Sequence, residues 1–157
     1  MPIDDLIAGW RSAWSGRDPA AFAELCDANA QYEDPLTDGP LVGVAALGEH
    51  AARLWEGFPD ALLESSGASV HGGAFVAAPC RLAGTHSQQL AGLPPTGRFV
   101  SVQCIFYCEL SGDLLRRVRG FFDLYHAAVQ LGVLPARNTL GEKALLLLRG
   151  YGLRAGD

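Results

Sequence analysis

The segment from Arg98 to Leu110 limits most strictly what this chain can fold into. Its apolar side chains recur at every second position. Hydrogen-bonding side chains stand between them, among them Ser101, Gln103, Tyr107 and Glu109. Because side chains alternate between the two faces of a β-strand, the pattern predicts a strand with one apolar and one polar face. An apolar face must be covered, so neighbouring segments have to supply a second layer.

The rest of the chain divides into helices first and strands later. Before Pro59 the apolar residues recur at spacings of three and four, the period of a helical face, and after it the period is two. The predicted helices cover residues 3–14, 18–25 and 43–60, a short strand and turn lie within 30–40, and strands cover 62–71, 74–84, 98–110 and 114–122. This order is typical of an α+β fold, in which helices cover one face of an antiparallel sheet.

The length of the chain and its last segment define two regions. Its 157 residues are enough for one domain with a hydrophobic core. We predict that residues 1–135 form this domain and that residues 136–157 form a helical extension. The helix within this extension is expected to end at Gly150 or Gly152. The leucines of 145–148 cover more than one face of that helix, which predicts that it is buried on two sides, with a subunit contact on one of them.

The charge and the cysteine pattern exclude several functions. The net charge is -5 and the only basic cluster is Leu115–Gly120, which argues against nucleic-acid binding. No stretch reaches the roughly 20 apolar residues of a membrane span, and the acidic N-terminus is unlike a signal peptide, so we predict a cytoplasmic protein without membrane contacts. The four cysteines form no CxxC pair and the four histidines show no ligand spacing, so we predict neither disulfides nor a metal.

Four stretches of the sequence carry a family resemblance. They are YEDP at 32–35, FPD at 58–60, GTHSQQLAGLPPTGRFV at 84–100 and FFDLYHAAVQLGVLP at 121–135. Together they resemble the signature stretches of the SnoaL-like polyketide cyclases, which share the nuclear transport factor 2-like fold. The resemblance implies a cystatin-like cone, in which helices pack on a strongly curved antiparallel sheet that encloses an apolar pocket. It also implies chemistry without a cofactor on a hydrophobic small molecule.

Asp123 is the first candidate for the acid and base of such chemistry. It stands between Phe122 and Leu124, and burial among apolar side chains would disfavour its charged form and make it a stronger base. The resemblance assigns the acid/base role to the same residue. This chain has Glu109 where the best-known cyclases have a histidine, and Gln88 where a glycine is usual. A helix cap, or a partner for a buried arginine, is the structural alternative for Asp123.

Two histidines are further catalytic candidates. His50 lies on the apolar face of the third predicted helix, and His86 lies near the end of a strand. Either could polarise a substrate carbonyl or hold a water, and either could be a core histidine bonded to the backbone. Asp34 could bond His50 and fix its tautomer, although an Asx turn before Pro35 explains an aspartate there at least as well.

Other side chains are candidates for the walls of a substrate pocket. The aromatic candidates are Trp14, Tyr32, Trp55 and Phe121, and a place in the core is the main alternative for the two tryptophans. The polar candidates from the 98–110 strand are Gln103, Tyr107 and Glu109. These three line the pocket if their face points inward, and otherwise face solvent or a subunit interface. A slip of one residue in register reverses every side chain, so both arrangements stay open.

These observations predict an enzyme that resembles polyketide cyclases. Asp123 would remove a proton next to a carbonyl, and the enolate would close a ring by an intramolecular aldol reaction. The alternatives are isomerisation, dehydration or epoxide opening on the same scaffold, because a fold does not fix a function, or a non-catalytic small-molecule-binding module. We also predict at least a homodimer that uses the apolar face of the 98–110 strand as its contact, whereas a monomer is expected if that face packs beneath the helices.

Overall fold

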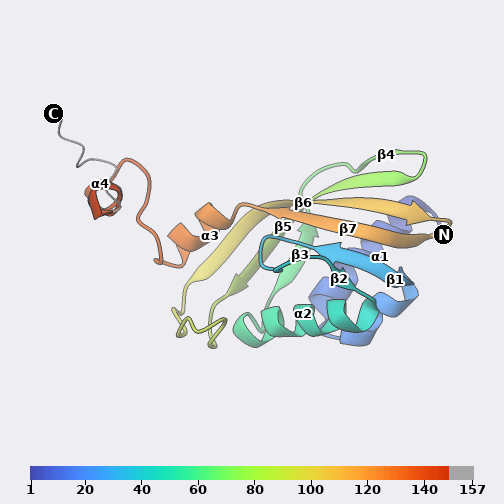
Figure 1. The fold of residues 1–157 in the computed structure, drawn as a ribbon, viewed down its shortest axis with the longest axis horizontal. Coiled ribbons are helices and arrows are strands. Elements are labelled where there is room, and N and C mark those ends of the chain that lie inside the picture. The colour runs from blue at the N-terminus through green and yellow to red at the C-terminus, as the bar shows by residue number, and fades with distance from the viewer. Residues whose placement is uncertain (149–157) are drawn as a thin grey trace.

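The computed structural model describes residues 1–148 of the chain. Helices α1 (Ile3–Gly16) and α2 (Val44–Gly57) and the short 3-10 helix η1 (Pro19–Glu24) lie against one face of a β-sheet (Figure 1). Helices α3 (Leu124–Gln130) and α4 (Leu140–Leu148) follow the last strand. The helices within residues 1–148 are all too short or too polar to cross a membrane.

The sheet is open and mixed. Its strands are β1 (Cys26–Glu33), β2 (Leu41–Val42), β3 (Leu62–Ser65), β4 (Val70–Gly72), β5 (Phe75–Thr85), β6 (Phe99–Ser111) and β7 (Leu114–Phe122). The order across the sheet is β2-β1-β7-β6-β5-β3, and β4 pairs with β5. Strands β1 and β7 are parallel and the other neighbours are antiparallel. The predicted α+β architecture, with helices packed on one face of the sheet, is confirmed.

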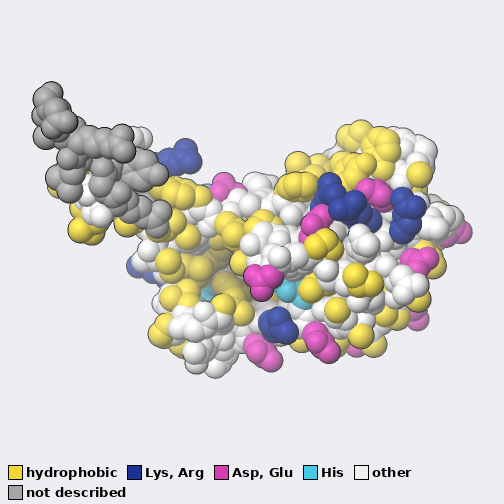
Figure 2. Space-filling model, viewed as in Figure 1, with side chains coloured by type: hydrophobic (Ala, Val, Ile, Leu, Met, Phe, Trp, Pro, Cys, Tyr) yellow, Lys and Arg dark blue, Asp and Glu magenta, His cyan; other side chains and the backbone are white. Residues whose placement is uncertain are grey.

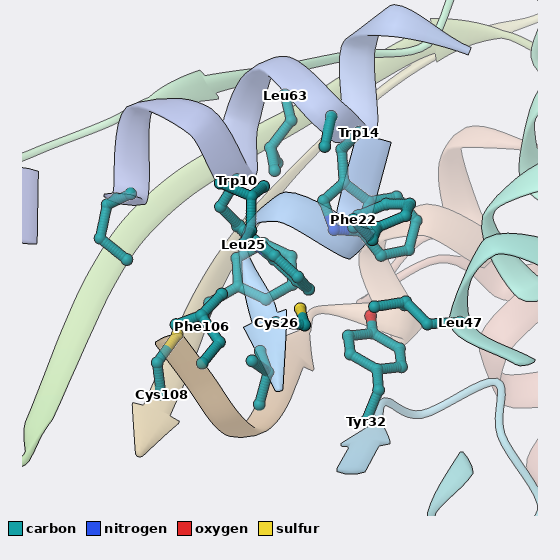
Figure 3. Packing of buried hydrophobic residues seen from close by; sticks show 14 of the residues in the cluster. Trp10, Trp14, Phe22, Leu25, Cys26, Tyr32, Leu47, Leu63, Phe106 and Cys108 are labelled. Atoms are coloured by element: carbon teal, nitrogen blue, oxygen red, sulfur yellow. The ribbon is translucent and has the colours of Figure 1, made fainter. Parts of the chain in front are cut away.

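The apolar face of β6 packs beneath the helices. Its buried side chains are Val100, Val102, Cys104, Phe106 and Cys108, none more than 6% exposed. Figure 3 shows the centre of the core, where α1, η1 and the sheet contribute Trp10, Trp14, Phe22, Tyr32 and Phe106. The predicted use of this face as an outer subunit contact is therefore wrong, because the helices already cover it.

The polar face of β6 points away from the helices. Gln103 is exposed, and Tyr107 and Glu109 are half-buried on that outer face. The register pairs Ile105 with Phe121, so Phe121 shares this face and is 57% exposed. The outward alternative therefore describes Gln103, Tyr107, Glu109 and Phe121, and on that face Phe121 and Glu109 each line an open hollow. The tertiary register, which the sequence left open, decides this.

Two predicted elements differ in detail from the structure. The strand predicted over 62–71 is divided into β3 and β4, which pair with β5 on either side of Pro79. Proline has no N–H group to donate, so the ladder is interrupted where Pro79 stands. The second predicted helix begins as expected, with the Asp18 side chain accepting from the Ala20 N–H at 2.9 Å, but it winds as the 3-10 helix η1.

Helix α4 stands away from the sheet and from α1 and α2 (Figure 1). None of its residues is buried, and Leu140 and Leu148 are 83% and 87% exposed. The prediction that this helix is buried on two sides is therefore wrong within the chain itself. Its predicted ends at Gly150 or Gly152 lie outside the described residues.

Candidate active site

A pocket of about 220 Å³ opens beside α2. Five separate segments meet there: α1, the loop after β1, α2, the loop between β5 and β6, and the end of β7. Its apolar lining consists of Trp14, Leu36, Leu54, Leu90, Ala91 and Phe122. Its polar lining consists of Asp34, His50 and Arg53. An apolar hollow with a few converging polar groups is the usual form of a small-molecule site.

Asp34 is the centre of a hydrogen-bond network in this pocket. The Tyr32 hydroxyl donates to Asp34 Oδ2 over 2.7 Å, and His50 Nε2 lies 2.8 Å from the same oxygen. The other oxygen, Oδ1, accepts the Leu36 N–H at 2.7 Å. Asp34 therefore makes both the bond to His50 and the Asx turn that the sequence offered as alternatives. The two roles are compatible because a carboxylate has two oxygens.

The electrostatics of this network fix which group carries which proton. Burial alone would raise the pKa of Asp34, but hydrogen bonds from His50 and Tyr32, the charge of His50 and the Leu36 N–H outweigh it and lower that pKa. Burial, and then the neighbouring Asp34 carboxylate, raise the pKa of Tyr32 well above 10.0. Asp34 is thus an ionised acceptor and Tyr32 a neutral donor.

This arrangement selects one tautomer of His50. Because ionised Asp34 can only accept, His50 Nε2 carries the hydrogen and donates it, and in the neutral form of the imidazole the lone pair then lies on Nδ1. Within residues 1–148 no hydrogen-bond partner is found for Nδ1. His50 is only partly exposed and lines the pocket, so Nδ1 is available as a base to a bound molecule.

The lowered pKa of Asp34 predicts a pH-dependent contribution to stability. With an unfolded pKa near 3.8, ionised Asp34 stabilises the fold fully above that pH, and this contribution is lost as the pH falls through the lower folded pKa. We expect Asp34→Asn to lower the melting temperature most near neutral pH, with the difference from wild type shrinking towards pH 3. Thermal melts followed by circular dichroism measure this difference. A difference that stays constant with pH would contradict the assignment.

His86 lies close to the pocket but does not line it. The ring is fully buried and lies tilted against that of Phe58 at a centroid distance of 5.2 Å. Its Nδ1 accepts the Thr96 N–H at 3.2 Å, and no partner for the buried Nε2 is found within residues 1–148. His86 therefore resembles a core histidine at Nδ1, which is bonded to the backbone. Its Nε2 makes no such bond within residues 1–148. The structure does not bring His86 into contact with His50 or Asp34.

Asp123 lies outside this pocket. Its side chain is exposed and accepts the His126 N–H at 2.9 Å, which caps the start of α3. The expected burial among apolar neighbours is wrong. Strand β7 turns Phe122 towards the core and Phe121 outward, and the chain then leaves the sheet at Asp123, so no apolar side chains enclose it. The helix-cap alternative describes the observed position.

The remaining predicted residues are divided between core and pocket. Trp14 belongs to both, because it packs in the core and lines the pocket. Trp55 is a core residue whose Nε1–H donates to the Trp14 carbonyl at 2.8 Å. Sequence reasoning did not single out Arg53, although its position three residues after His50 places both on one helical face. Leu90 gave no signal, because only the folding of the 86–97 loop over α2 brings it to the pocket.

Two larger hollows in the described part of the molecule are lined by paired charges, and a third, of about 320 Å³, is lined by Asp123, Tyr125, His126, Val129, Ala136 and Arg137. One of about 470 Å³ is lined by Glu33 and Arg119, which form an ion pair of 2.6 Å. Within residues 1–148, no three histidine, cysteine, aspartate or glutamate side chains are placed to hold a metal ion. The pocket at His50 combines a histidine that is bonded to a buried carboxylate with a largely apolar wall.

Comparison with solved structures gives the class of fold. A protein from Catenulispora acidiphila described as having a ketosteroid isomerase-like fold is 18% identical, with a TM-score of 0.69 over 81% of this chain and 92% of that one. TsrD from Streptomyces laurentii is 20% identical, with a TM-score of 0.75 over 84% and 96%. IdmH, a polyketide cyclase candidate from Streptomyces antibioticus, is 25% identical, with a TM-score of 0.74 over 84% and 99%. The chain thus has the ketosteroid isomerase-like fold.

The family follows from the sequence match. The model of the SnoaL-like polyketide cyclase family matches residues 4–131, so the chain belongs to that family. None of the curated proteins compared with the chain matches it. The extension after residue 131, which includes α4, lies outside the family match.

Proposed function

We propose that this protein is a cofactor-free enzyme that enolises a hydrophobic carbonyl compound and closes a ring by an intramolecular aldol reaction. The observation that carries the proposal is the Asp34–His50 pair, 2.8 Å apart, at a pocket whose lining is apolar apart from this pair and Arg53. Membership in the SnoaL-like polyketide cyclase family supports the reaction type. The family resemblance pointed to Asp123 as the base, whereas the geometry favours His50.

The proposed reaction has two proton transfers. His50 Nδ1 removes a proton from the carbon next to a carbonyl, and the C–H electron pair forms the enolate. The enolate carbon then attacks a second carbonyl carbon of the same molecule, forming a C–C bond and an alkoxide. The imidazolium of His50 returns the proton to that alkoxide. Asp34 keeps its charge throughout and stabilises the imidazolium, and Tyr32 holds Asp34 in place.

Proton exchange at carbon tests the first step without knowledge of the natural substrate. We expect the protein to accelerate deuterium uptake by 2-tetralone, a bicyclic ketone, in D₂O at neutral pD, followed by proton NMR against a protein-free control. Isomerisation would begin with the same enolisation, whereas a purely binding protein would leave the exchange rate unchanged. The absence of acceleration under saturating binding would contradict the proposal.

We also propose that the protein forms a homodimer through the outer face of the sheet. This face carries exposed apolar side chains on neighbouring strands, with Phe99, Ile105 and Phe121 63%, 47% and 57% exposed. A specific interface buries roughly 800 Å² on each partner, and these side chains could form its centre. Sedimentation velocity at micromolar concentration should show a dimer, and Ile105→Glu should shift it to monomer. Sedimentation of the wild-type protein only as a monomer would contradict the proposed homodimer.

A further inference from the structure

The pocket contains one charged side chain that the proposed reaction does not use. Arg53 lies on α2 one helical turn after His50 and lines the same pocket. It is exposed at the surface. On the face drawn in Figure 2, histidine, basic and acidic side chains all reach the surface in the region of α2. The rim of the pocket therefore carries a positive charge next to the candidate base.

Arg53 has no carboxylate partner within residues 1–148, as is also true of Arg11, Arg17, Arg98 and Arg137, but unlike them it lines the pocket at His50. Four others pair with glutamates at 4.0 Å or less: Arg81, Arg116, Arg117 and Arg119. Arg17 donates to the backbone carbonyls of Ser15 and Ala61. Within residues 1–148 no ion pair or hydrogen bond is found for the Arg53 guanidinium, even though Glu49 and Glu56 lie one turn away on the same helix.

The other polar groups of the pocket cannot serve as the carboxylate partner of Arg53. Asp34 is committed to Tyr32, His50 and Leu36. The remaining lining is apolar. An anionic group of a bound molecule could therefore meet Arg53 without displacing an existing ion pair. Arginine presents its N–H groups as a planar fork, which matches the two oxygens of a carboxylate.

We propose that Arg53 makes this pocket selective for substrates that carry an ionised carboxylate beside the reacting carbonyl. The inference rests on the proposed function, since it takes the pocket at His50 to be the substrate site. The carboxylate would lie at the rim against Arg53, and the hydrocarbon rings would lie against Trp14 and Phe122. The proton to be removed would then face His50 on the same side of α2. At about 220 Å³ the pocket suits a compact ring system.

Binding of a matched pair of small probes tests this selectivity. The probes are 2-naphthoic acid, which is ionised at neutral pH, and 2-naphthamide, which has nearly the same shape without the charge. We expect Arg53→Gln in the full chain to weaken binding of the acid about five- to tenfold and to leave binding of the amide within about twofold. Arg81→Gln is the control, because it removes the same charge at a site outside the pocket. Isothermal titration calorimetry measures the affinities.

Amide chemical shifts then separate the failure of this inference from the failure of the proposed site. Shifts that centre on Leu36, Leu54 and Ala91, with the preference for the acid lost in Arg53→Gln alone, support the proposal. The same shifts with an unchanged preference in Arg53→Gln overturn the role of Arg53 and leave the site intact. If neither probe shifts these residues at millimolar concentration, both the selectivity and the proposed site are overturned.

Discussion

Replacement of His50 by glutamine is expected to lower the rate of enzyme-catalysed deuterium exchange about a thousandfold, because it removes the base and keeps the fold. The glutamine amide can still donate to Asp34 Oδ2, so the hydrogen bond that joins α2 to the end of β1 is preserved. The side chain no longer offers a lone pair of suitable basicity at the position of Nδ1. Melting temperature should therefore change by only a few degrees while activity collapses.

Two further variants decide which carboxylate the reaction needs. Asp34→Asn should cost about a hundredfold or more, because an amide that donates to Nε2 would place the hydrogen on Nδ1 and block the base. Asp123→Asn is the matched control, since Asp123 is exposed and bonds only the His126 N–H. Its activity should stay within about tenfold of wild type. If Asp123→Asn abolished exchange and His50→Gln did not, Asp123 would be the base, as the family resemblance implies, and our proposal for His50 would fail.

The largest effect on stability is expected at Trp10. This side chain is fully buried, and its ring lies 5.4–6.0 Å, centroid to centroid, from those of four aromatic neighbours: Trp14, Phe22, Tyr32 and Phe106. Trp10→Ala would leave a large cavity where α1 meets the sheet (Figure 3). We expect it to lower the free energy of unfolding by about 3–5 kcal/mol, a large part of the stability of a typical domain. Urea unfolding monitored by circular dichroism measures the loss.

Two companion variants show whether packing causes that loss. Trp10→Phe should cost much less, because it keeps an aromatic ring in the core and removes an indole N–H that has no partner within residues 1–148. Leu148→Ala should change stability by no more than about 0.5 kcal/mol, since Leu148 is 87% exposed. Equal losses in Trp10→Ala and Leu148→Ala would show that Trp10 is not central to the core.

The elements that depend on local periodicity could be predicted from the sequence alone. The alternation from Val100 to Leu110 predicted β6, and the spacing of Ile3, Trp10 and Trp14 predicted α1. Both patterns have a period that one element satisfies alone, so a single buried face explains them. The aspartate-proline pair at 18 and 19 likewise marked the start of η1, because a cap acts within a few residues.

The sequence analysis named both Asp34 and His50 as candidates, but it could not show that the two side chains lie within hydrogen-bond distance. Asp34 and His50 are 16 residues apart and meet only because α2 packs beside the end of β1. The bond to His50 and an Asx turn were the two alternatives for Asp34, and the structure contains both. Arg53 was not singled out, because a lone arginine on a helix gives no signal until its lack of a partner is known.

The direction in which each strand face points depends on packing between distant segments and could not be predicted from the sequence. The alternation in β6 was compatible with either orientation, and the register with β7 and the helices above it placed Phe106 inside and Tyr107 outside. The same geometry left Asp123 at the point where the chain leaves the sheet, although its neighbours in sequence are apolar. The burial of a side chain depends on which distant segments pack against it, and the residues next to it in the sequence do not determine those contacts.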